Sequence, residues 1–348
     1  MSADEKRFAE ILKKTVVHIL LICLLIVTSL QAGGRYAGAS LELGLGARSL
    51  ALGGAAVTLS GTIDHFFYNP SSLAFVENPS VGLMFAPTFG SISDPMANYN
   101  YIGFALPLAG GGTIAVNWTR FTVDDIPIYP DLRGNSYTER FYDRQLRPDG
   151  TALGFFRDRE DVYYFSFAKS IRTVLPLGWL FIDLPIEIPF GLNLKVLRQK
   201  LYQSKASGLG FDVGTMLRFN LGTLLDNRSF GDLTLGLSML DFTQTAIIWD
   251  TKQEDRIRRT VLFGVSYQHY LGFQKSYINF YWNRLNKYQQ VNLYGAEFAM
   301  KGLSLRIGKN RSGLTAGAGF HLWRFVVDYA FVTTDFDNSH RISTTVIF

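Results

Sequence analysis

The amino-acid sequence predicts an all-β protein, a transmembrane antiparallel β-barrel of about fourteen strands. Three observations support this prediction. Aromatic residues make up 14 % of the 348 residues and charged residues only 18 %, whereas soluble proteins carry ~25 % charged residues. Beyond residue 78, short segments alternate apolar with small or polar side chains. The connections between these segments alternate between tight and long, as in outer-membrane barrels.

Residues 1–32 have the layout of a cleavable signal peptide. A basic region ending at Lys14 precedes an apolar stretch from Thr15 to Leu30, and Ala32 followed by two glycines offers a cleavage site. A permanent helical anchor is the alternative, although the stretch is near the lower length limit for one. Cys23, the only cysteine, lies in this stretch, so we expect a mature chain without disulfides or thiolate metal sites.

The charge pattern gives no support for nucleic-acid binding. The chain carries 34 basic and 29 acidic residues, and removal of residues 1–32 leaves 30 against 26. This small excess is dispersed along the sequence, without a run of basic residues.

The strands follow from side chains that alternate between two faces. Between Trp323 and Val332, Phe325, Val327 and Tyr329 share one face, opposite Asp328. Successive side chains of a strand point to opposite faces, so each such segment has one apolar and one polar side. The predicted strands are 79–89, 99–108, 112–123, 161–171, 185–201, 207–221, 232–242, 259–268, 276–284, 290–300, 303–309, 313–322, 323–332 and 339–348.

Alternation also occurs in soluble sandwiches, but the polar face here is rich in Gly, Ser, Thr and Asn, where a soluble core needs a second apolar layer. In hydrocarbon an open sheet edge leaves unpaired backbone groups, so a spanning sheet must close into a barrel at 79–348. We expect the outer membrane of a Gram-negative-type bacterium, with the long loops 124–160 and 243–258 facing outward. The apolar connection 172–184 falls on the periplasmic side and either extends a strand or forms a small hairpin.

Residues 33–78 form a separate N-terminal piece. Asn69 is a predicted helix cap, and Pro70 suits the first helical position. Glycines within an apolar stretch permit close backbone approach, as inside a barrel mouth, although an ordinary strand and loop is the alternative. These glycines are Gly44, Gly46, Gly53 and Gly54.

Both ends of the chain resemble one protein family. The run from Gly46 to Ala55, followed by Tyr68 to Ala74, is similar to the N-terminal signature of the PorV/PorQ family, which is related to FadL-type fatty-acid transporters. Residues 338–343 and the final Phe348 resemble its last strand, while the middle agrees only in pattern. Two positions depart from the signature: only Asp64 remains of the usual acidic pair, and Tyr68 replaces a tryptophan.

The resemblance implies a fourteen-stranded outer-membrane barrel whose N-terminal segment plugs the lumen as a hatch. The candidate hatch residues are Gly53, Gly54, Asp64, Asn69 and Pro70. The resemblance also implies a C-terminal signal for the barrel-assembly machinery, for which the candidates are Val346 and Phe348.

No catalytic residue, metal site or cofactor is predicted. The histidines lack metal-ligand spacing, and no phosphate-binding loop, dinucleotide fingerprint or nucleophile elbow is present. A surface hydrolase using Ser339, His340 and His321 is a remote alternative. The charged run from Arg157 to Asp161 is expected to be a solvated loop with exchanging ion pairs.

Two non-enzymatic functions remain. The PorV/PorQ resemblance implies a docking or shuttle component in protein export to the cell surface, of the type IX secretion kind, with loops that recognise secreted cargo proteins. The FadL relationship implies uptake of hydrophobic small molecules. We expect the first, because the end motifs are closer to PorV/PorQ. The expected partners are outer-membrane lipids, the assembly machinery, and either cargo proteins or hydrophobic ligands.

Overall fold

The structure is a computed structural model that describes residues 37–90, 93–129, 138–139, 152–178, 182–227, 229–334 and 338–348. The chain divides into residues 1–34 and residues 35–348, and only the second unit is considered below. The predicted signal peptide lies outside the described residues. Within them, no helix is both long and apolar enough to cross a membrane.

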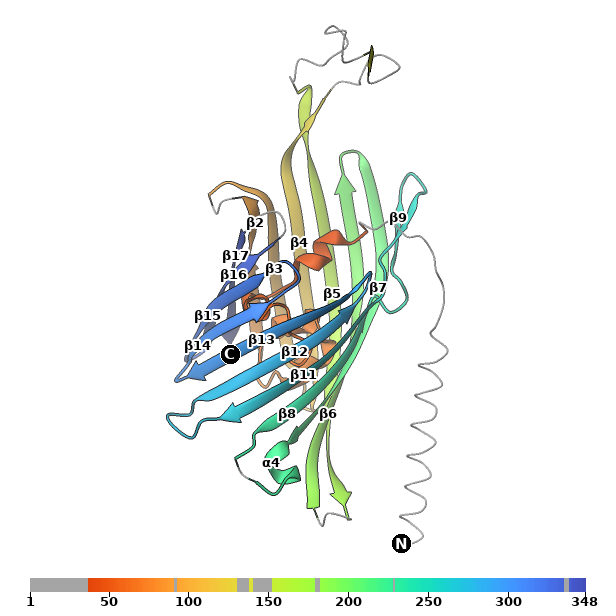
Figure 1. Ribbon diagram of the computed structural model, residues 1–348. Helices are drawn as coiled ribbons and strands as arrows, with labels where there is room; N and C mark the ends of the chain where they lie inside the picture. Colours follow the sequence, from red (N-terminus) through yellow and green to blue (C-terminus); the bar gives the residue numbers. More distant parts are fainter. Residues whose placement is uncertain are drawn as a thin grey trace, which may run out of the picture. The chain divides into compact units, whose positions relative to one another are not determined.

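Fourteen antiparallel strands of the described chain close into a barrel (Figure 1). They are β1 (Ser80–Phe85), β3 (Pro95–Pro107), β4 (Gly112–Ile128), β5 (Gly154–Leu177), β6 (Ile182–Leu201), β7 (Ser204–Asn220), β8 (Asp232–Leu240), β11 (Thr260–Tyr270), β12 (Tyr277–Asn286), β13 (Gln290–Met300), β14 (Leu303–Lys309), β15 (Leu314–Leu322), β16 (Phe325–Thr333) and β17 (Asn338–Ile347). β17 pairs with β1 from Ile342 opposite Phe85 to Ile347 opposite Ser80, and this pairing closes the ring. The predicted closed barrel is confirmed.

Three further strands and one helix lie in the connections between strands of the ring. β2 (Pro87–Gly90) continues β1 along β3. β9 (Ala246–Trp249) and β10 (Glu254–Arg256) form a hairpin inside the predicted loop 243–258, and β9 pairs with the start of β7. α4 (Leu221–Leu224) lies between β7 and β8.

The greatest departure from the predicted strands concerns β5. The expected loop 124–160 is wrong, because β4 and β5 pair as far as Ile128 opposite Gly154, across an irregularity between Val123 and Ile126. Residues 157–161 therefore belong to a strand and not to a solvated loop. At the other end, Leu177 pairs with Ile182, so the apolar connection 172–184 extends β5 and β6 into one long hairpin.

Apolar side chains cover the outside of the ring. The register sets Leu305, Ala318 and Tyr329 side by side on one face of β14, β15 and β16, with Arg306 and Asp328 on the other. Exposed apolar side chains occur on strands all around the ring; they include Phe85, Phe104, Val116, Phe165, Leu192, Phe211, Phe263, Phe280, Leu305, Ile307, Phe320 and Ile342. A closed ring with an apolar exterior is the construction of a membrane-spanning barrel.

The connections fall at two ends. The strands joined by the connections 86–94, 129–153, 202–203, 241–259, 287–289, 310–313 and 334–337 meet at the loop end. The strands joined by the connections 108–111, 178–181, 221–231, 271–276, 301–302 and 323–324 meet at the turn end, where the C-terminal residue also lies. The two longest connections belong to the loop end, but short connections occur at both ends, so tight and long connections do not strictly alternate.

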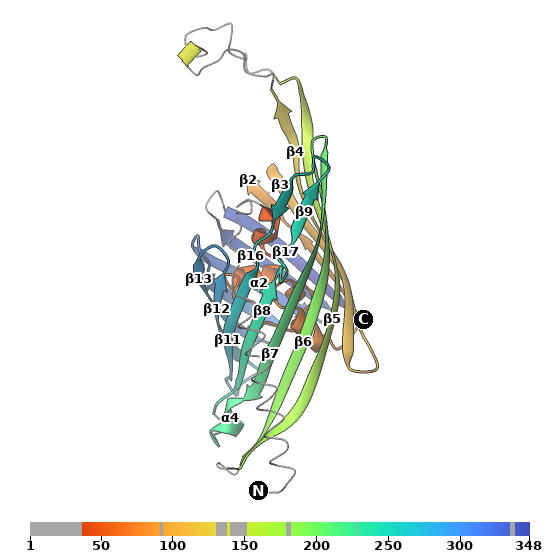
Figure 2. The ribbon, with the colours of Figure 1, turned by 90° about the vertical axis from the view of Figure 1, so that its right-hand side faces the viewer.

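Residues 37–78, called the inner segment from here on, lie inside the ring of strands (Figure 2). Its short helices are η1 (Ala39–Leu43), α2 (Ala47–Ala51), η2 (Ile63–Phe67) and η3 (Pro70–Phe75). α2 packs on β14 to β17, and η3 packs on β4 to β7. The backbone N–H of Ala47 donates to Oγ of Ser343 on the last strand, at 3.1 Å.

The hydrophobic core lies between the inner segment and the barrel wall. Phe66 is fully buried and its ring meets that of Tyr164 on β5 edge to face, with 5.0 Å between centroids. Aromatic pairs of this kind contribute about 0.5–1.5 kcal/mol beyond their burial. The inward face of the barrel is thus packed against the inner segment, whereas the alternation of the strands indicated only a polar lining.

Candidate functional site

The Asn-Pro turn of the inner segment is seated against a glycine-lined part of the wall. The side-chain Oδ1 of Asn69 accepts from the backbone N–H of Ser71 at 3.1 Å, which confirms the predicted cap of η3. Its Nδ2 donates to the backbone carbonyl of Thr215 on β7 at 3.2 Å. A Cβ on Gly191 would lie 2.5 Å from the carbonyl carbon of Pro70, and one on Gly214 would lie 2.1 Å from Oδ1 of Asn69. The turn therefore fits only because the wall lacks side chains there.

The two central glycines of the inner segment differ in their surroundings. Both have a positive φ, 68° at Gly53 and 77° at Gly54. A Cβ on Gly53 would lie 2.6 Å from the carbonyl oxygen of Lys309 on β14, whereas one on Gly54 would meet only a methyl of Leu293, at 3.6 Å. The predicted close backbone approach occurs at Gly53, and Gly54 supplies only the unusual backbone angle.

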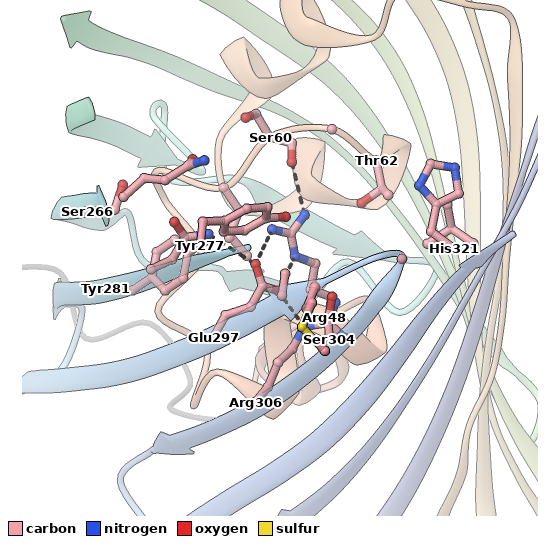
Figure 3. Close-up of a pocket in the computed structure, with 18 of the residues that line it drawn as sticks. Arg48, Ser60, Thr62, Ser266, Tyr277, Tyr281, Glu297, Ser304, Arg306 and His321 are labelled. Carbon is pink, nitrogen blue, oxygen red and sulfur yellow. Dashed lines mark hydrogen bonds and ion pairs between the residues drawn. The ribbon is translucent and has the colours of Figure 1, made fainter. Parts of the chain in front are cut away.

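A network of four charged residues joins the inner segment to the wall, and Figure 3 shows three of them, Arg48, Glu297 and Arg306. Arg48 donates from Nε and Nη2 to the two carboxylate oxygens of Glu297, at 3.0 and 2.8 Å. Arg306 donates to Glu297 at 2.6 Å and to Asp328 at 2.6 Å. Two guanidinium groups thus balance two carboxylates, and a bidentate arginine–carboxylate pair is both strong and geometrically specific. Burial by itself lowers the pKa of Arg48, but the Glu297 carboxylate outweighs it and holds that pKa well above the ordinary value.

Two ionisable residues of η2 are buried without a strong counter-charge. Asp64, a predicted hatch residue, sits against Gly46, on which a Cβ would lie 1.7 Å from Oδ2 of the carboxyl group. Burial raises the pKa of Asp64 above its usual range. Burial lowers the pKa of His65 well below its usual range, so the imidazole is neutral at physiological pH.

A second charged cluster lies on the wall formed by β6, β7 and β8. Nζ of Lys195 lies 2.8 Å from Oδ1 of Asp212 and 2.6 Å from Oδ1 of Asp241. Thr245 donates to Asp241 at 2.7 Å, and Asn193 donates to Asp212 at 3.1 Å. All five side chains are buried, so a buried ammonium here is held by two carboxylates as buried charges require.

A polar cavity of about 470 Å³ opens at the turn end. Its lining includes Arg48, Ser60 and Thr62 of the inner segment, shown in Figure 3 with Glu297 and Arg306 of the wall. Other lining residues, among them Lys275 and Lys301, belong to the connections of the turn end.

A second cavity of about 470 Å³ lies at the loop end and is mostly apolar. The inner segment contributes its η1 leucines, both central glycines, and the rings of Phe67 and Tyr68. The apolar side chains of the wall that line it include Leu240, Leu262, Leu285, Val291 and Leu293. Residues of the tight connections 287–289 and 310–313 lie at its rim. The inner segment therefore separates an apolar cavity at one end from a polar cavity at the other.

Arg341 of β17 lines the apolar cavity and is nearly fully buried, at 2 % exposed. Its Nη1 donates to Oγ1 of Thr88 at 2.6 Å, while its Nε has no hydrogen-bond partner among the described residues. None of the described carboxylates forms an ion pair with it. A buried guanidinium in this state is costly unless a further acceptor is supplied.

The C-terminal residues named by the sequence lie on the outer face. Val346 is aligned with Phe325 of β16 and Val81 of β1. Phe348 continues the alternation, is 58 % exposed, and donates its backbone N–H to the carbonyl of Pro79. Their role in barrel assembly stays a prediction.

The residues of the imagined hydrolase site do not converge. Ser339 is buried and faces the lumen beside Val332, whereas His340 faces outward and lies 2.7 Å from the hydroxyl of Tyr329. His321 faces the polar cavity at the turn end. Among the described residues, no three His, Cys, Asp or Glu side chains gather as metal ligands would.

Sequence reasoning missed the two charged clusters and Arg341. Glu297, Arg306 and Asp328 all occupy the polar face of their predicted strands, and that position was the available signal. Their partners are far apart in the chain, since Arg48 and Glu297 are separated by 249 residues. Alternation therefore indicates that such charges face the lumen, but not which of them pair.

Comparisons with known proteins give structural similarity only. No protein-family profile and no curated protein sequence matches the chain. The toluene transporter TodX of Pseudomonas putida has 12 % identity and a TM-score of 0.45, over 87 % of this chain and 97 % of that one. A FadL homologue of Pseudomonas aeruginosa has 8 % identity and a TM-score of 0.42, over 87 % and 98 %. The translocator domain of the autotransporter NalP from Neisseria meningitidis has 11 % identity and a TM-score of 0.35, over 92 % and 100 %. Because identities and TM-scores are this low, function is argued from the residues of this chain.

Proposed function

We propose that this chain is an outer-membrane barrel that takes up hydrophobic small molecules. The observation that carries the proposal is the apolar cavity at the loop end, divided by the inner segment from the polar cavity at the turn end. A volume of about 470 Å³ lies within the ~300–1,000 Å³ of small-molecule sites. Each methylene group buried there contributes about 0.8 kcal/mol to binding.

Arg341 refines the expected ligand. It lines the apolar cavity and forms no ion pair with any described carboxylate, so a molecule with a hydrocarbon body and one anionic group would suit both features. Such a ligand would supply the counter-charge that the buried guanidinium lacks among the described residues.

Transfer to the turn end requires movement of the inner segment, because its residues line both cavities. The connection between its two halves runs through Gly53 and Gly54, whose backbone conformations only glycine adopts at low cost. On the turn-end side, this movement must break the ion pair between Arg48 and Glu297. The inner segment then acts as the hatch that the resemblance implies.

The experiment is a binding titration with 11-(dansylamino)undecanoic acid, a fluorescent long-chain carboxylate, on purified protein in detergent. Leu262→Trp fills the cavity, and Phe263→Trp places the same ring at the neighbouring position, on the outer face. We expect at least tenfold weaker binding for Leu262→Trp and unchanged binding for Phe263→Trp. Absence of binding to the unmodified protein, or equal binding to both variants, would refute the proposal.

The export role implied by the PorV/PorQ resemblance stays a prediction. The first of its two expected recognition elements was the loop 124–160, and residues 130–137 and 140–151 of that stretch lie outside the described residues. The second expected element, 243–258, contains the β9–β10 hairpin. Nothing in the described part of the chain favours cargo binding over uptake.

A further inference from the structure

The outer face of β4 to β7 carries side chains in ordered rows near the loop end. The strand register sets four residues side by side in each row. From the middle of the barrel toward the loop end, the rows are Val116, Phe165, Leu194 and Phe211; then Trp118, Tyr163, Val196 and Leu209; then Arg120, Asp161, Arg198 and Ser207; then Thr122, Arg159, Lys200 and Lys205.

The rows change from apolar to aromatic to charged. Val116 and Phe165 are 52 % and 47 % exposed, as lipid-facing side chains are. In the second row, the rings of Trp118 and Tyr163 are stacked, with 6.4 Å between centroids and 12° between planes. Trp and Tyr rings are enriched where hydrocarbon meets the headgroup layer. The aromatic row therefore marks the upper boundary of the hydrocarbon.

The two charged rows carry five cations and one carboxylate. Asp161, which is 4 % exposed, accepts from Nε of Arg120 at 2.7 Å and from Nε of Arg159 at 2.6 Å. It also accepts from the indole N–H of Trp118 at 2.9 Å. Because the carboxylate binds each arginine through Nε, it fixes both guanidinium groups and leaves their Nη ends without an acceptor among the described residues. The two arginine side chains remain 31 % and 45 % exposed.

The remaining cations extend this arrangement sideways. The guanidinium of Arg198 lies 6.0 Å from the ring centre of Tyr163, and Lys200 and Lys205 are exposed beyond it. Two further carboxylates approach the edges of the patch. Asp250 accepts from the backbone N–H of Lys205 at 3.0 Å. Asp124, beyond Thr122, forms an ion pair with Arg157 and adds no net charge. On the β3 side the rows continue with the neutral Asn98 and Asn100. The positively charged rows of β4 to β7 therefore end at β3.

We propose that this sector, defined by Arg120, Arg159, Arg198 and Lys200, binds the phosphate-bearing headgroup of an outer-leaflet lipid whose acyl chains lie on the apolar rows below. Successive rows are two residues apart, which is about 5 Å along the membrane normal for a strand tilted by ~40°. The charged rows therefore lie about 5 and 10 Å beyond the hydrocarbon boundary. The headgroup layer is about 5–8 Å thick on each side, so the first charged row lies within this layer and the long side chains of the second row lie at its outer edge.

The chemistry of the cations suits phosphate. Arginine presents a planar fork that binds phosphate oxygens through two parallel hydrogen bonds, and its weak hydration lowers the cost of leaving water. Asp161 cancels one charge but pre-orders two guanidinium groups, which reduces the entropy lost on binding. A soluble acidic protein would need to displace the headgroups that already occupy this height, whereas a lipid satisfies the cations and the apolar rows together.

The test measures lipid retention by native mass spectrometry on the full-length protein. The patch variant Arg198→Gln/Lys200→Gln removes two charges and leaves the Asp161 contacts intact. The control variant Arg284→Gln/Lys309→Gln removes two charges from outward-facing strand positions near the loop end of β12 and β14. Heat modifiability on gels verifies that every variant is folded. The probes are diphosphoryl lipid A, monophosphoryl lipid A and phosphatidylcholine, with inorganic phosphate as a soluble competitor.

We expect the unmodified protein to retain diphosphoryl lipid A best and phosphatidylcholine least. The patch variant should lose at least fivefold in retained diphosphoryl lipid A, while the control variant should keep it. Three results would overturn the proposal: equal retention by patch and control variants, equal retention of all three lipids, or complete displacement by millimolar inorganic phosphate, which would identify a free-anion site.

Discussion

Replacement of Gly53 by alanine tests whether the inner segment is held tightly against β14. The substitution introduces a single methyl group into a residue with φ of 68°. The new Cβ would lie 2.6–2.7 Å from the O, C and N atoms of Lys309, and these are backbone atoms of a paired strand. The neighbouring Gly54 is a matched control, because its φ is 77° but its Cβ would make an ordinary contact at 3.6 Å.

The magnitude follows from this comparison. A left-handed backbone angle costs alanine about 1–2 kcal/mol, and both variants share this cost. Only Gly53→Ala must also separate the inner segment from β14, by the roughly 0.8 Å between 2.6 Å and the 3.4 Å of ordinary contact. Overpacking of this kind costs about 1–3 kcal/mol. The opening equilibrium of the inner segment should therefore be roughly 5- to 160-fold larger in Gly53→Ala than in Gly54→Ala.

Thiol labelling measures this equilibrium. Cys23 is the only cysteine of the chain and lies in the predicted signal peptide, so Ser49→Cys in α2 provides a single buried reporter. The labelling rate of the introduced thiol is proportional to the open population when closing is fast compared with modification. Equal labelling rates in Gly53→Ala and Gly54→Ala would show that the close approach to Lys309 does not hold the inner segment in place.

Three further predictions concern the inner segment. Burial lowers the pKa of His65, so as the pH falls the unfolded state binds a proton before the folded state does. The free energy of unfolding should therefore fall as the pH drops below about 6.5. If the difference in free energy of unfolding between wild type and His65→Gln, measured in urea, stays constant from pH 8 to pH 5, this prediction is wrong. Arg48→Met leaves the buried network with an excess carboxylate, which destabilises the closed position of the inner segment by about 3–5 kcal/mol. The Ser49→Cys reporter should therefore be labelled faster. Glu297→Gln in the same chain removes the excess charge and should reverse much of that increase. Tyr68→Phe removes the hydroxyl that accepts from the Leu45 N–H at 3.0 Å and donates to its carbonyl at 3.1 Å; urea unfolding should show a loss of about 1–3 kcal/mol, and a loss below about 0.5 kcal/mol would contradict the assigned bonds.

The sequence was most informative where the signal is local or periodic. The alternation of apolar and polar side chains predicted every strand of the ring, because successive residues of a strand face lipid and lumen in turn. The Asn69 cap was equally accessible, since a cap depends on residues two or three positions away. The start of β5 was misjudged because Arg157 and Arg159 resemble a solvated loop. In the structure they are residues of β5 near the loop end of the barrel.

The site itself depended on information that no local pattern contains. The Arg48–Glu297 pair and the position of Arg341 against the apolar cavity arise from the closure of the ring around the inner segment. The likeness of the chain ends to PorV/PorQ indicated a filled lumen, but it could not indicate which wall residues contact the filling. Gly191 and Gly214 illustrate this, because their significance lies in what a side chain would strike.

The pairing of β17 with β1 has a consequence for biogenesis. The stretch that fills the lumen precedes every strand of the ring in the chain, while the strand that seals the ring follows all the others. The bond from Ala47 to Ser343 joins the inner segment to this final strand of the ring. During membrane insertion, β1 and β17 must therefore stay unpaired until the inner segment lies inside the ring of strands. Deletion of β17 should then prevent folding of the whole barrel instead of producing a slightly smaller barrel.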